Sequence, residues 1–182
     1  AELPALVARA AAGELPVAGA LAAEALRIAA WRPRFATEVD DRTIPHELDW
    51  LRSAVHLSKG CYRGQETVAK VHNLGRPPRR LVLLQLDGSD AVLPGPGADV
   101  RLPAAADGTP GETVGAVTSS ALHHELGPIA LAVVRRAVDP DAQLEVVADD
   151  VRVQAAQDVI VPTDAGRSAD VPRLPRLGAV RR

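Results

Sequence analysis

Apolar residues recur at helical spacing in the first part of the chain. Residues 3–12 are rich in Ala and are followed by Gly13, a pattern that favours a short helix with a glycine stop. Between residues 17 and 30 the apolar positions lie three or four residues apart, which predicts a second helix that ends before Pro33. Those apolar positions are Val17, Leu21, Ala25 and Ile28.

The next segment has a weaker pattern. Residues 34–44 are rich in charge and have no period, so we expect an irregular connection. Pro45 suits the first position of a helical turn that reaches Leu51. A further helix is predicted over residues 64–74, closed by Gly75 and the two prolines that follow it.

The spacing of the apolar residues changes from a helical to a strand-like pattern after Pro78. Short runs of β-branched and aliphatic residues follow, and Gly or Pro punctuates most of the gaps between them. The expected strands are residues 80–86, 100–102, 113–119, 129–134, 144–147 and 151–153. Six short strands in about 75 residues indicate a small β-barrel or a β-sandwich.

The chain therefore divides into a helical part and a β-rich part, which is an α+β organisation. The boundary falls near residues 75–79, so we expect one domain at 1–75 and a second at 76–160. Residues 161–182 contain repeated Pro and Arg without a period, which predicts an extended or disordered tail.

Composition narrows the classes of protein. A single Cys excludes a disulfide scaffold and a cysteine cage for zinc or iron–sulfur held by this chain alone, so no stable metal is expected. No apolar run approaches the ~18 residues of a membrane span, and nothing resembles a signal peptide. A cytoplasmic location is expected, and the excess of Arg over Lys is typical of a GC-rich bacterium. The chain also lacks Met and begins at Ala1, which suggests a processed chain or a fragment.

The net charge of −2 conceals a segregation of charge along the chain. Residues 59–80 carry six basic side chains and one acidic side chain, whereas residues 81–150 carry three basic and eleven acidic side chains. A basic segment thus lies beside an acidic one, and the basic segment is where an anionic ligand would be drawn.

The densest group of reactive residue types lies at positions 59–66, with the sequence Lys-Gly-Cys-Tyr-Arg-Gly-Gln-Glu. Cys61 stands close to Lys59 and Arg63, directly before a predicted helix, in a positive field that favours a thiolate. The glycines permit close backbone approach or positive φ, and the residues after Gly64 suit the first turn of a helix. The alternative is that Cys61 is a small buried apolar residue.

This segment, which we call the signature segment (residues 59–66), resembles the signature of the YgfZ branch of the folate-binding GcvT-like family. Three other stretches resemble that family in the same order. They are Ala25-Leu26-Arg27-Ile28-Ala29-Ala30, Thr43-Ile44-Pro45-His46-Glu47, and the pair of segments at 115–119 and 127–134. The resemblance covers roughly residues 13–150.

The resemblance implies a fold and a function. Members of the family are rings of three lobes around a folate-sized channel, and this chain resembles their C-terminal half: the end of an α/β lobe, the helical signature segment and a small antiparallel β-barrel of about six strands. The YgfZ branch implies a tetrahydrofolate-binding protein that supports assembly or repair of iron–sulfur enzymes, including enzymes that modify tRNA. The implied partners are the N-terminal half of the same protein and those client enzymes, with no membrane and no direct nucleic-acid binding.

One departure bears on the alternative function, which is folate-dependent aminomethyl transfer of the glycine-cleavage T-protein type. Those enzymes usually have Leu-Arg-Leu-Glu-Ala-Gly where this chain has residues 26–31. Their Glu, expected to contact the pterin, corresponds to Ala29, whose methyl group accepts no hydrogen bond. The resemblance therefore favours the YgfZ branch, and conventional enzymatic turnover is not required by it.

The resemblance also assigns candidate residues. Cys61 would be the reactive group, as nucleophile, cluster ligand or disulfide partner, with Lys59 keeping the thiolate charged and Tyr62 offering a hydroxyl or a stacking face. The candidates for folate binding are Arg27, Glu47, Gly64, Gln65 and Glu66. Arg27 has a second interpretation as a buried ion-pair partner, and Glu47 as an acid in the first turn of a helix.

Further residues carry weaker signals. His46, His56 and His72 lie near the signature segment and could help Cys61 hold a metal ion or cluster, since His and thiolate suit iron and zinc, but their spacing fits no recognised ligand pattern. His123 and His124 are expected in a loop or at the surface. The arginines at 76, 79 and 80 suit either an anion, such as folate polyglutamate or RNA phosphate, or a solvated linker. Because no aromatic residues are interleaved with them, RNA binding is not favoured.

Overall fold

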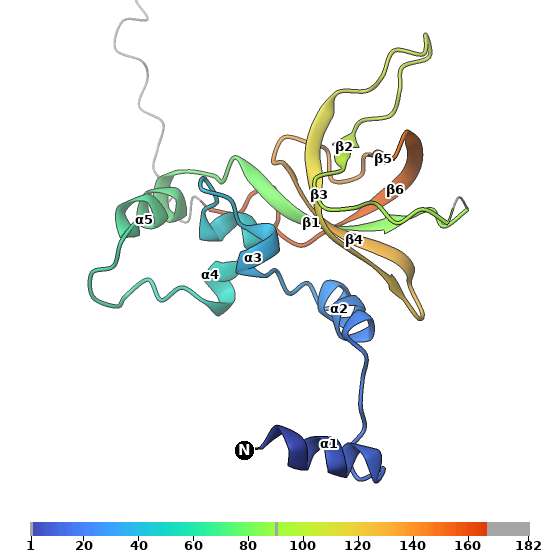
Figure 1. Ribbon diagram of the computed structural model, residues 1–182. Coiled ribbons are helices and arrows are strands. Elements are labelled where there is room, and N and C mark those ends of the chain that lie inside the picture. Colours follow the sequence, from blue (N-terminus) through green and yellow to red (C-terminus); the bar gives the residue numbers. More distant parts are fainter. Residues whose placement is uncertain (1, 90, 167–182) are drawn as a thin grey trace, which may run out of the picture.

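The computed structural model describes residues 2–89 and 91–166 of the chain. Short helices come first and strands follow (Figure 1). The helices are α1 (Leu3–Ala11), α2 (Ala20–Ala29), α3 (Phe35–Glu38), the 3-10 turn η1 (Pro45–Leu48), α4 (Trp50–Ser53) and α5 (Gln65–Leu74). The strands are β1 (Arg79–Leu86), β2 (Asp99–Arg101), β3 (Thr113–His123), β4 (Gly127–Arg135), β5 (Leu144–Ala148) and β6 (Val151–Val159).

The six strands close into an antiparallel barrel with the order β1-β4-β3-β2-β5-β6. The pairs β1–β6 and β2–β5 join strands that are far apart in sequence, and they complete the ring. A closed barrel leaves no strand edge exposed for pairing with another chain. The predicted α+β fold with a six-stranded barrel is confirmed, and the sandwich alternative is wrong.

Two apolar clusters hold the molecule together, and β1 contributes to both. Val82 and Leu84 point into the barrel with the other members of the interior cluster, while Leu81 and Leu83 point outward. The outward cluster packs beneath α2 and η1, where Ile28 and Leu48 are almost completely buried. Because successive side chains of a strand alternate between faces, one continuous apolar strand serves the barrel and the helices at once.

The helices differ in how firmly they are packed. α2 lies against β3 and β4, and η1 lies against β1 and α5, so α2 to α5 follow one side of the barrel (Figure 1). α1 stands apart at the end of an extended link and has no buried residue (Figure 1). No helix in the described part of the chain is both long enough and apolar enough to cross a membrane.

Several sequence expectations need correction at the level of elements. Residues 34–44 contain the short helix α3, which has too few residues to show a period. The single turn expected over 45–51 is two turns, separated at Asp49 by a left-handed residue with φ of 59°. β3, β4 and β6 are longer than expected because their ends pair in register with a neighbour even where the sequence is polar. The last barrel strand ends at Val159.

The predicted tail is only partly within the described residues. Val161 is buried and Ala165 packs against the outward cluster, so the first residues after the barrel are part of the fold. The remainder of the predicted tail, residues 167–182, lies outside the described residues.

Candidate functional site

The signature segment forms the entry to α5. Gly64 precedes the helix with φ of 85°, a left-handed conformation that glycine adopts without a steric penalty. The Tyr62 N–H donates to the side-chain carbonyl of Gln65 at 3.1 Å, and the Gln65 N–H donates to the Tyr62 carbonyl at 3.2 Å. These two hydrogen bonds fix the turn, so Gly64 and Gln65 have a structural role in addition to any contact with a ligand.

Cys61 is exposed in the loop before this turn. The interpretation of Cys61 as a buried apolar residue is therefore wrong. The ammonium of Lys59 lies 5.0 Å from the centre of the Tyr62 ring, a cation–π contact. The loop thus presents a thiol to solvent, flanked by a cation whose position is restrained by an aromatic ring.

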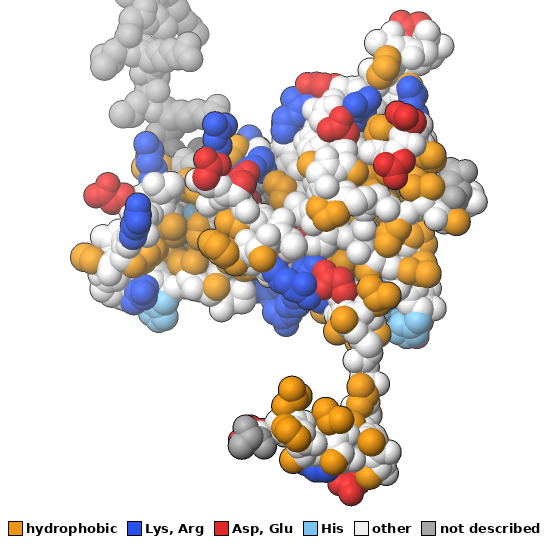
Figure 2. Space-filling model, viewed as in Figure 1, with side chains coloured by type: hydrophobic (Ala, Val, Ile, Leu, Met, Phe, Trp, Pro, Cys, Tyr) orange, Lys and Arg blue, Asp and Glu red, His pale blue; other side chains and the backbone are white. Residues whose placement is uncertain are grey.

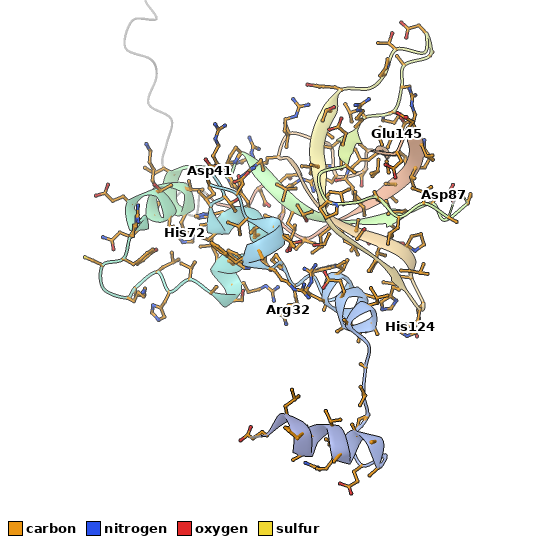
Figure 3. The ribbon with its side chains drawn as sticks, in the orientation of Figure 1. Arg32, Asp41, His72, Asp87, His124 and Glu145 are labelled. Atoms are coloured by element: carbon orange, nitrogen blue, oxygen red, sulfur yellow. The ribbon has the colours of Figure 1, made fainter. Side chains whose placement is uncertain are left out.

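A cleft of about 510 Å³ lies beside this loop. Two segments that the sequence singled out separately form its walls: the loop before η1 and the signature segment. Its lining residues are Asp41, Arg42, Thr43, Ile44, Pro45, Ala54, Val55, His56, Lys59, Tyr62, Arg63, Gly64, Thr67 and Val68. The basic residues Arg42, Lys59 and Arg63 outnumber the single acid Asp41, labelled in Figure 3, so the cleft suits an anionic ligand. We call it the basic cleft.

Glu47 lies behind the wall of this cleft, with its side chain completely buried. It accepts hydrogen bonds from the guanidinium of Arg79 at 2.8 and 3.2 Å, and from the Ile44 N–H at 3.4 Å. Arg79 also pairs with Asp40 at 2.6 Å, and these hydrogen bonds hold the pKa of Asp40 well below its usual range. Arg79 therefore fastens the loop and η1 to the start of β1. Whether Glu47 also contacts folate stays a prediction.

Arg27 is the centre of a second ion-pair network. Its guanidinium pairs with Glu24 and Glu38 and donates a hydrogen bond to the Ser119 hydroxyl at 2.7 Å. Glu38 is buried and also accepts a hydrogen bond from Ser119. The structure thus supports the ion-pair interpretation of Arg27, and its folate contact stays a prediction. Sequence reasoning missed Glu38 and Ser119, because nothing in their local pattern marks a partner from another element.

The three arginines predicted as an anion site or a linker have separate environments. Arg76 is exposed. Arg80 is fully buried and points into the barrel, since it shares a face with Val82. It donates to the Val138 carbonyl at 3.1 Å and to the Gln157 side chain at 2.8 Å, and burial lowers its pKa. The expectation that Arg80 lies in a solvated linker or meets an anion outside is therefore wrong.

The histidines have different environments within the described residues. No group of three or more His, Cys, Asp or Glu side chains in residues 2–89 and 91–166 is arranged to hold a metal ion. His46 is 2% exposed, and its ring centre lies 6.4 Å from that of His72 on α5, which Figure 3 labels. The expectation of a surface position is wrong for His123, which is buried and accepts hydrogen bonds from two N–H groups in the β3–β4 turn.

We expect His46 to make the fold sensitive to mild acid. Burial lowers the pKa of His46, and the nearby His72 lowers it further. Once unfolded, His46 takes up a proton near pH ~6.5, whereas in the folded protein it resists protonation until a lower pH. The free energy of unfolding should therefore fall as the pH decreases from 7 through this window.

Chemical denaturation at pH 7.5, 6.5 and 5.5 measures this effect. The variant His46→Phe should lose less stability across this range than the wild type, and His124→Gln, at an exposed position, should follow the wild type. The Asp40 carboxylate affects stability at lower pH than His46 does. Its hydrogen bonds lower its pKa, so its contribution to the free energy of unfolding is lost only when the pH falls below the ordinary carboxyl pKa. An identical pH slope for His46→Phe and the wild type would exclude His46 as the cause.

Comparison with known proteins gives two findings. The glycine cleavage T-protein C-terminal barrel domain matches residues 79–161. The chain is also similar to the crystal structure of glycine cleavage system aminomethyltransferase T from Bartonella henselae, with a TM-score of 0.64 and 19% identity over 91% of this chain and 44% of that one. The chain therefore spans less than half the length of that protein. No curated protein matches the chain.

These findings agree with the geometry. The matched residues coincide with the barrel, and the likeness to the T-protein structure extends beyond the barrel over most of the helical part. Both support the resemblance to the GcvT-like folate-binding family that the signature segment indicated, while its YgfZ branch stays a prediction. Residues 79–161 match the glycine cleavage T-protein C-terminal barrel domain, and the chain shares its fold with part of the Bartonella henselae aminomethyltransferase T structure.

Proposed function

We propose that this chain is the C-terminal half of a tetrahydrofolate-binding protein that supports assembly or repair of iron–sulfur enzymes, including enzymes that modify tRNA. The observation that carries the proposal is the position of Cys61. It is exposed in the signature segment, next to Lys59 and Tyr62, which both line the basic cleft. A reactive thiol beside an anion-binding cleft suits chemistry on a partner protein.

The chemistry available to Cys61 follows from its surroundings. A thiolate is the form that attacks electrophiles, binds iron and exchanges with disulfides, and Lys59 and Arg63 would attract an anionic partner to the loop that contains Cys61. Iron–sulfur clusters are usually held by four thiolates, and this chain has one Cys. In this proposal Cys61 therefore supplies one transient ligand or one mixed disulfide, and the cluster is cargo that belongs to the client enzyme.

The basic cleft has properties that fit part of a folate. Its volume of about 510 Å³ lies within the range of small-molecule sites, roughly 300–1,000 Å³. Arg42 and Arg63 would bind the glutamate carboxylates of the folate, with Thr43 and Thr67 as further hydrogen-bonding groups. When bound, tetrahydrofolate supplies a carrier of one-carbon units. Arg27 and Glu47 would position the walls through their ion pairs, and Gly64, Gln65 and Glu66 would shape the turn beside the cleft.

A second polypeptide segment is part of the proposal. Large apolar side chains on and around α1, α2 and α3 are exposed, including Leu3 at 71%, Leu21 at 86% and Phe35 at 77%. Figure 2 shows apolar side chains over much of α1. Since the chain matches 44% of the Bartonella henselae protein, we propose that these residues contact the N-terminal half of the fold. The proposed location is the bacterial cytoplasm.

Aminomethyl transfer is the second candidate, and the fold shared with the Bartonella henselae aminomethyltransferase favours it. Ala29 argues against it, because a methyl group stands where those enzymes usually have an acid. Ala29 is packed against the outward cluster, where a carboxylate would need a partner.

The test uses the chain together with the N-terminal half of the fold. Isothermal titration with 5-formyltetrahydrofolate measures folate binding, and the activities of iron–sulfur enzymes are compared in bacteria with and without the protein. We expect folate binding, low iron–sulfur enzyme activity in the strain without the protein, and no aminomethyl transfer to or from a lipoylated carrier. Aminomethyl transfer with normal iron–sulfur enzymes would favour the second candidate. If folate does not bind, iron–sulfur enzyme activity is normal and no aminomethyl group is transferred, both candidates are excluded.

A further inference from the structure

Both tryptophans of the chain line one small cavity, separate from the basic cleft. The cavity has a volume of about 180 Å³ and shares no lining residue with the cleft. Its lining residues are Trp31, Arg32, Pro33, Leu48, Asp49, Trp50, Arg52 and Ser53. Because whole-ligand sites usually enclose roughly 300–1,000 Å³, this cavity suits one flat ring of a larger molecule. We call it the tryptophan cavity.

Trp31 occupies a backbone position that ordinarily belongs to glycine. α2 ends in a Schellman motif: the Trp31 N–H donates to the Ile28 carbonyl at 3.0 Å, and the Arg32 N–H donates to the Arg27 carbonyl at 3.1 Å. Trp31 stands at the left-handed position of this motif with φ of 56°. A bulky side chain there is a steric outlier, and such outliers cluster at sites that clamp ligands. The left-handed backbone is unfavourable for Trp, and the residue is still 40% exposed, so burial of the indole does not account for its presence. The geometry therefore points to a role for the ring itself.

Two other lining residues belong to the packed core. Trp50 packs against the outward apolar cluster, and Leu48, which is 1% exposed, is a member of that cluster. Asp49, between them, is a second residue with left-handed backbone, with φ of 59°. Trp50 is thus held against the core, whereas Trp31 is 40% exposed, so a ligand that enters the cavity can reach the Trp31 side chain from solvent.

The cavity also offers a positive charge. Of its two guanidinium groups, that of Arg52 is paired with Asp49, whereas Arg32 has no ion pair with any residue in the described part of the chain. The Arg32 carbonyl accepts a hydrogen bond from Arg27 at 2.7 Å, so the backbone beside this charge is anchored to the Arg27 network. Figure 3 labels Arg32 between α2 and α4, and Figure 2 shows basic side chains gathered there.

We propose that the tryptophan cavity binds a flat heteroaromatic ring joined to an anionic group, with the ring stacked on Trp31 and Trp50 and the anion paired with Arg32. Stacking on indole is largely insensitive to the identity of the ring, and Arg adds a charge-assisted contact. Folates and nucleotides both have this chemistry. The folate source rests on the proposed function, whereas the nucleotide source does not.

The two tryptophans make the test specific, because all indole fluorescence of the chain comes from this cavity. The intact chain is titrated with 5-formyltetrahydrofolate and, separately, with GMP, with free N-acetyltryptophanamide as the optical control. We expect saturable quenching by one of the two ligands. Trp31→Gly should weaken binding about 10-fold or more, because one stacking face is lost. It should leave the melting temperature unchanged or higher, because glycine relieves the left-handed position.

Matched variants separate binding from folding. Arg32→Gln should weaken binding and Arg76→Gln, an exposed arginine outside the cavity, should not. Phe35→Ala removes an exposed aromatic ring outside the cavity and should bind as the wild type does. Binding is measured for these variants by isothermal titration in parallel.

The outcomes distinguish folate from nucleotide as the ligand of the tryptophan cavity and show whether the cavity binds either of them. Quenching by the folate alone assigns the cavity to folate, and quenching by GMP alone keeps the cavity while removing support for folate at this site. Calorimetric folate binding that leaves both indoles unaffected and is equally strong in Trp31→Gly overturns the cavity while the proposed function stands. No saturable quenching by either ligand up to millimolar concentration overturns the proposal.

Discussion

Replacing Arg79 with Met should lower the free energy of unfolding by about 2–4 kcal/mol. The substitution leaves the Glu47 carboxylate, whose side chain is fully buried, with a single long hydrogen bond from the Ile44 N–H. Removing one partner of a buried ion pair usually costs about 3–5 kcal/mol. The value expected here is lower because the Arg79 side chain is 29% exposed, so water can reach part of the space that it leaves. Urea denaturation of the chain measures the change.

Two further variants identify the cause. Arg79→Lys retains the charge but only one point of contact, and it should fall between the wild type and Arg79→Met, because Lys cannot form the two-pronged pair. Combining Arg79→Met with Glu47→Gln should recover part of the loss, since no buried charge is then left unpaired. If the double variant is as unstable as the sum of the two single variants, the pair is not coupled and this account of η1 is wrong.

The same variant tests how the basic cleft is held. Arg79 ties Asp40 and Glu47 to β1, and the residues between them form one wall of the cleft. Hydrogen exchange should therefore become faster in residues 40–48 of Arg79→Met than in the barrel strands, because the loop and η1 lose their attachment. Uniformly faster exchange would indicate a general loss of stability instead.

Local patterns predicted the elements that depend on local interactions. α5 was found between Gly64 and Gly75 because glycine conformation and a helical period mark both ends. The barrel strands were found because apolar runs alternate with Gly and Pro. The choice between barrel and sandwich was decided by β1–β6 and β2–β5 pairing, which depends on contacts that no short window of sequence contains.

The adjacent arginines of β1 show why side-chain environments were harder to predict. Arg79 and Arg80 look equivalent in the sequence, yet one pairs with Glu47 outside the barrel and the other is buried inside it. The alternation of a strand extends from Val82 back to Arg80 and places it on the interior face. A charged residue is rarely found there, which is why a linker was the more natural interpretation.

The candidate site was predicted in part. The signature segment and the Thr43–Pro45 segment were both recognised, and both line the basic cleft. The tryptophan cavity was missed because Trp31 follows α2 and Trp50 begins α4, so that the two residues meet only in the folded chain. The left-handed backbone of Trp31 at the end of α2 could not be predicted either, because the sequence there contains no glycine to mark it.

Replacing Cys61 with Ser should remove the proposed function while leaving the fold intact. Cys61 is exposed, so the substitution should change the free energy of unfolding by no more than about 0.5 kcal/mol. A serine hydroxyl is not deprotonated at neutral pH and neither binds iron as a thiolate nor forms a disulfide. Bacteria that carry Cys61→Ser in the full protein should therefore have iron–sulfur enzyme activities as low as those of bacteria without it.

Variants of neighbouring residues serve as controls for Cys61→Ser. Ser58→Ala, at an exposed position in the same loop, should support wild-type iron–sulfur enzyme activity. Lys59→Gln and Arg63→Gln, which both still contain Cys61, should support more iron–sulfur enzyme activity than Cys61→Ser does. If Cys61→Ser restores full activity, the thiol is dispensable, and a function carried by the basic cleft and its bound folate alone would then explain the signature segment better than a reactive cysteine.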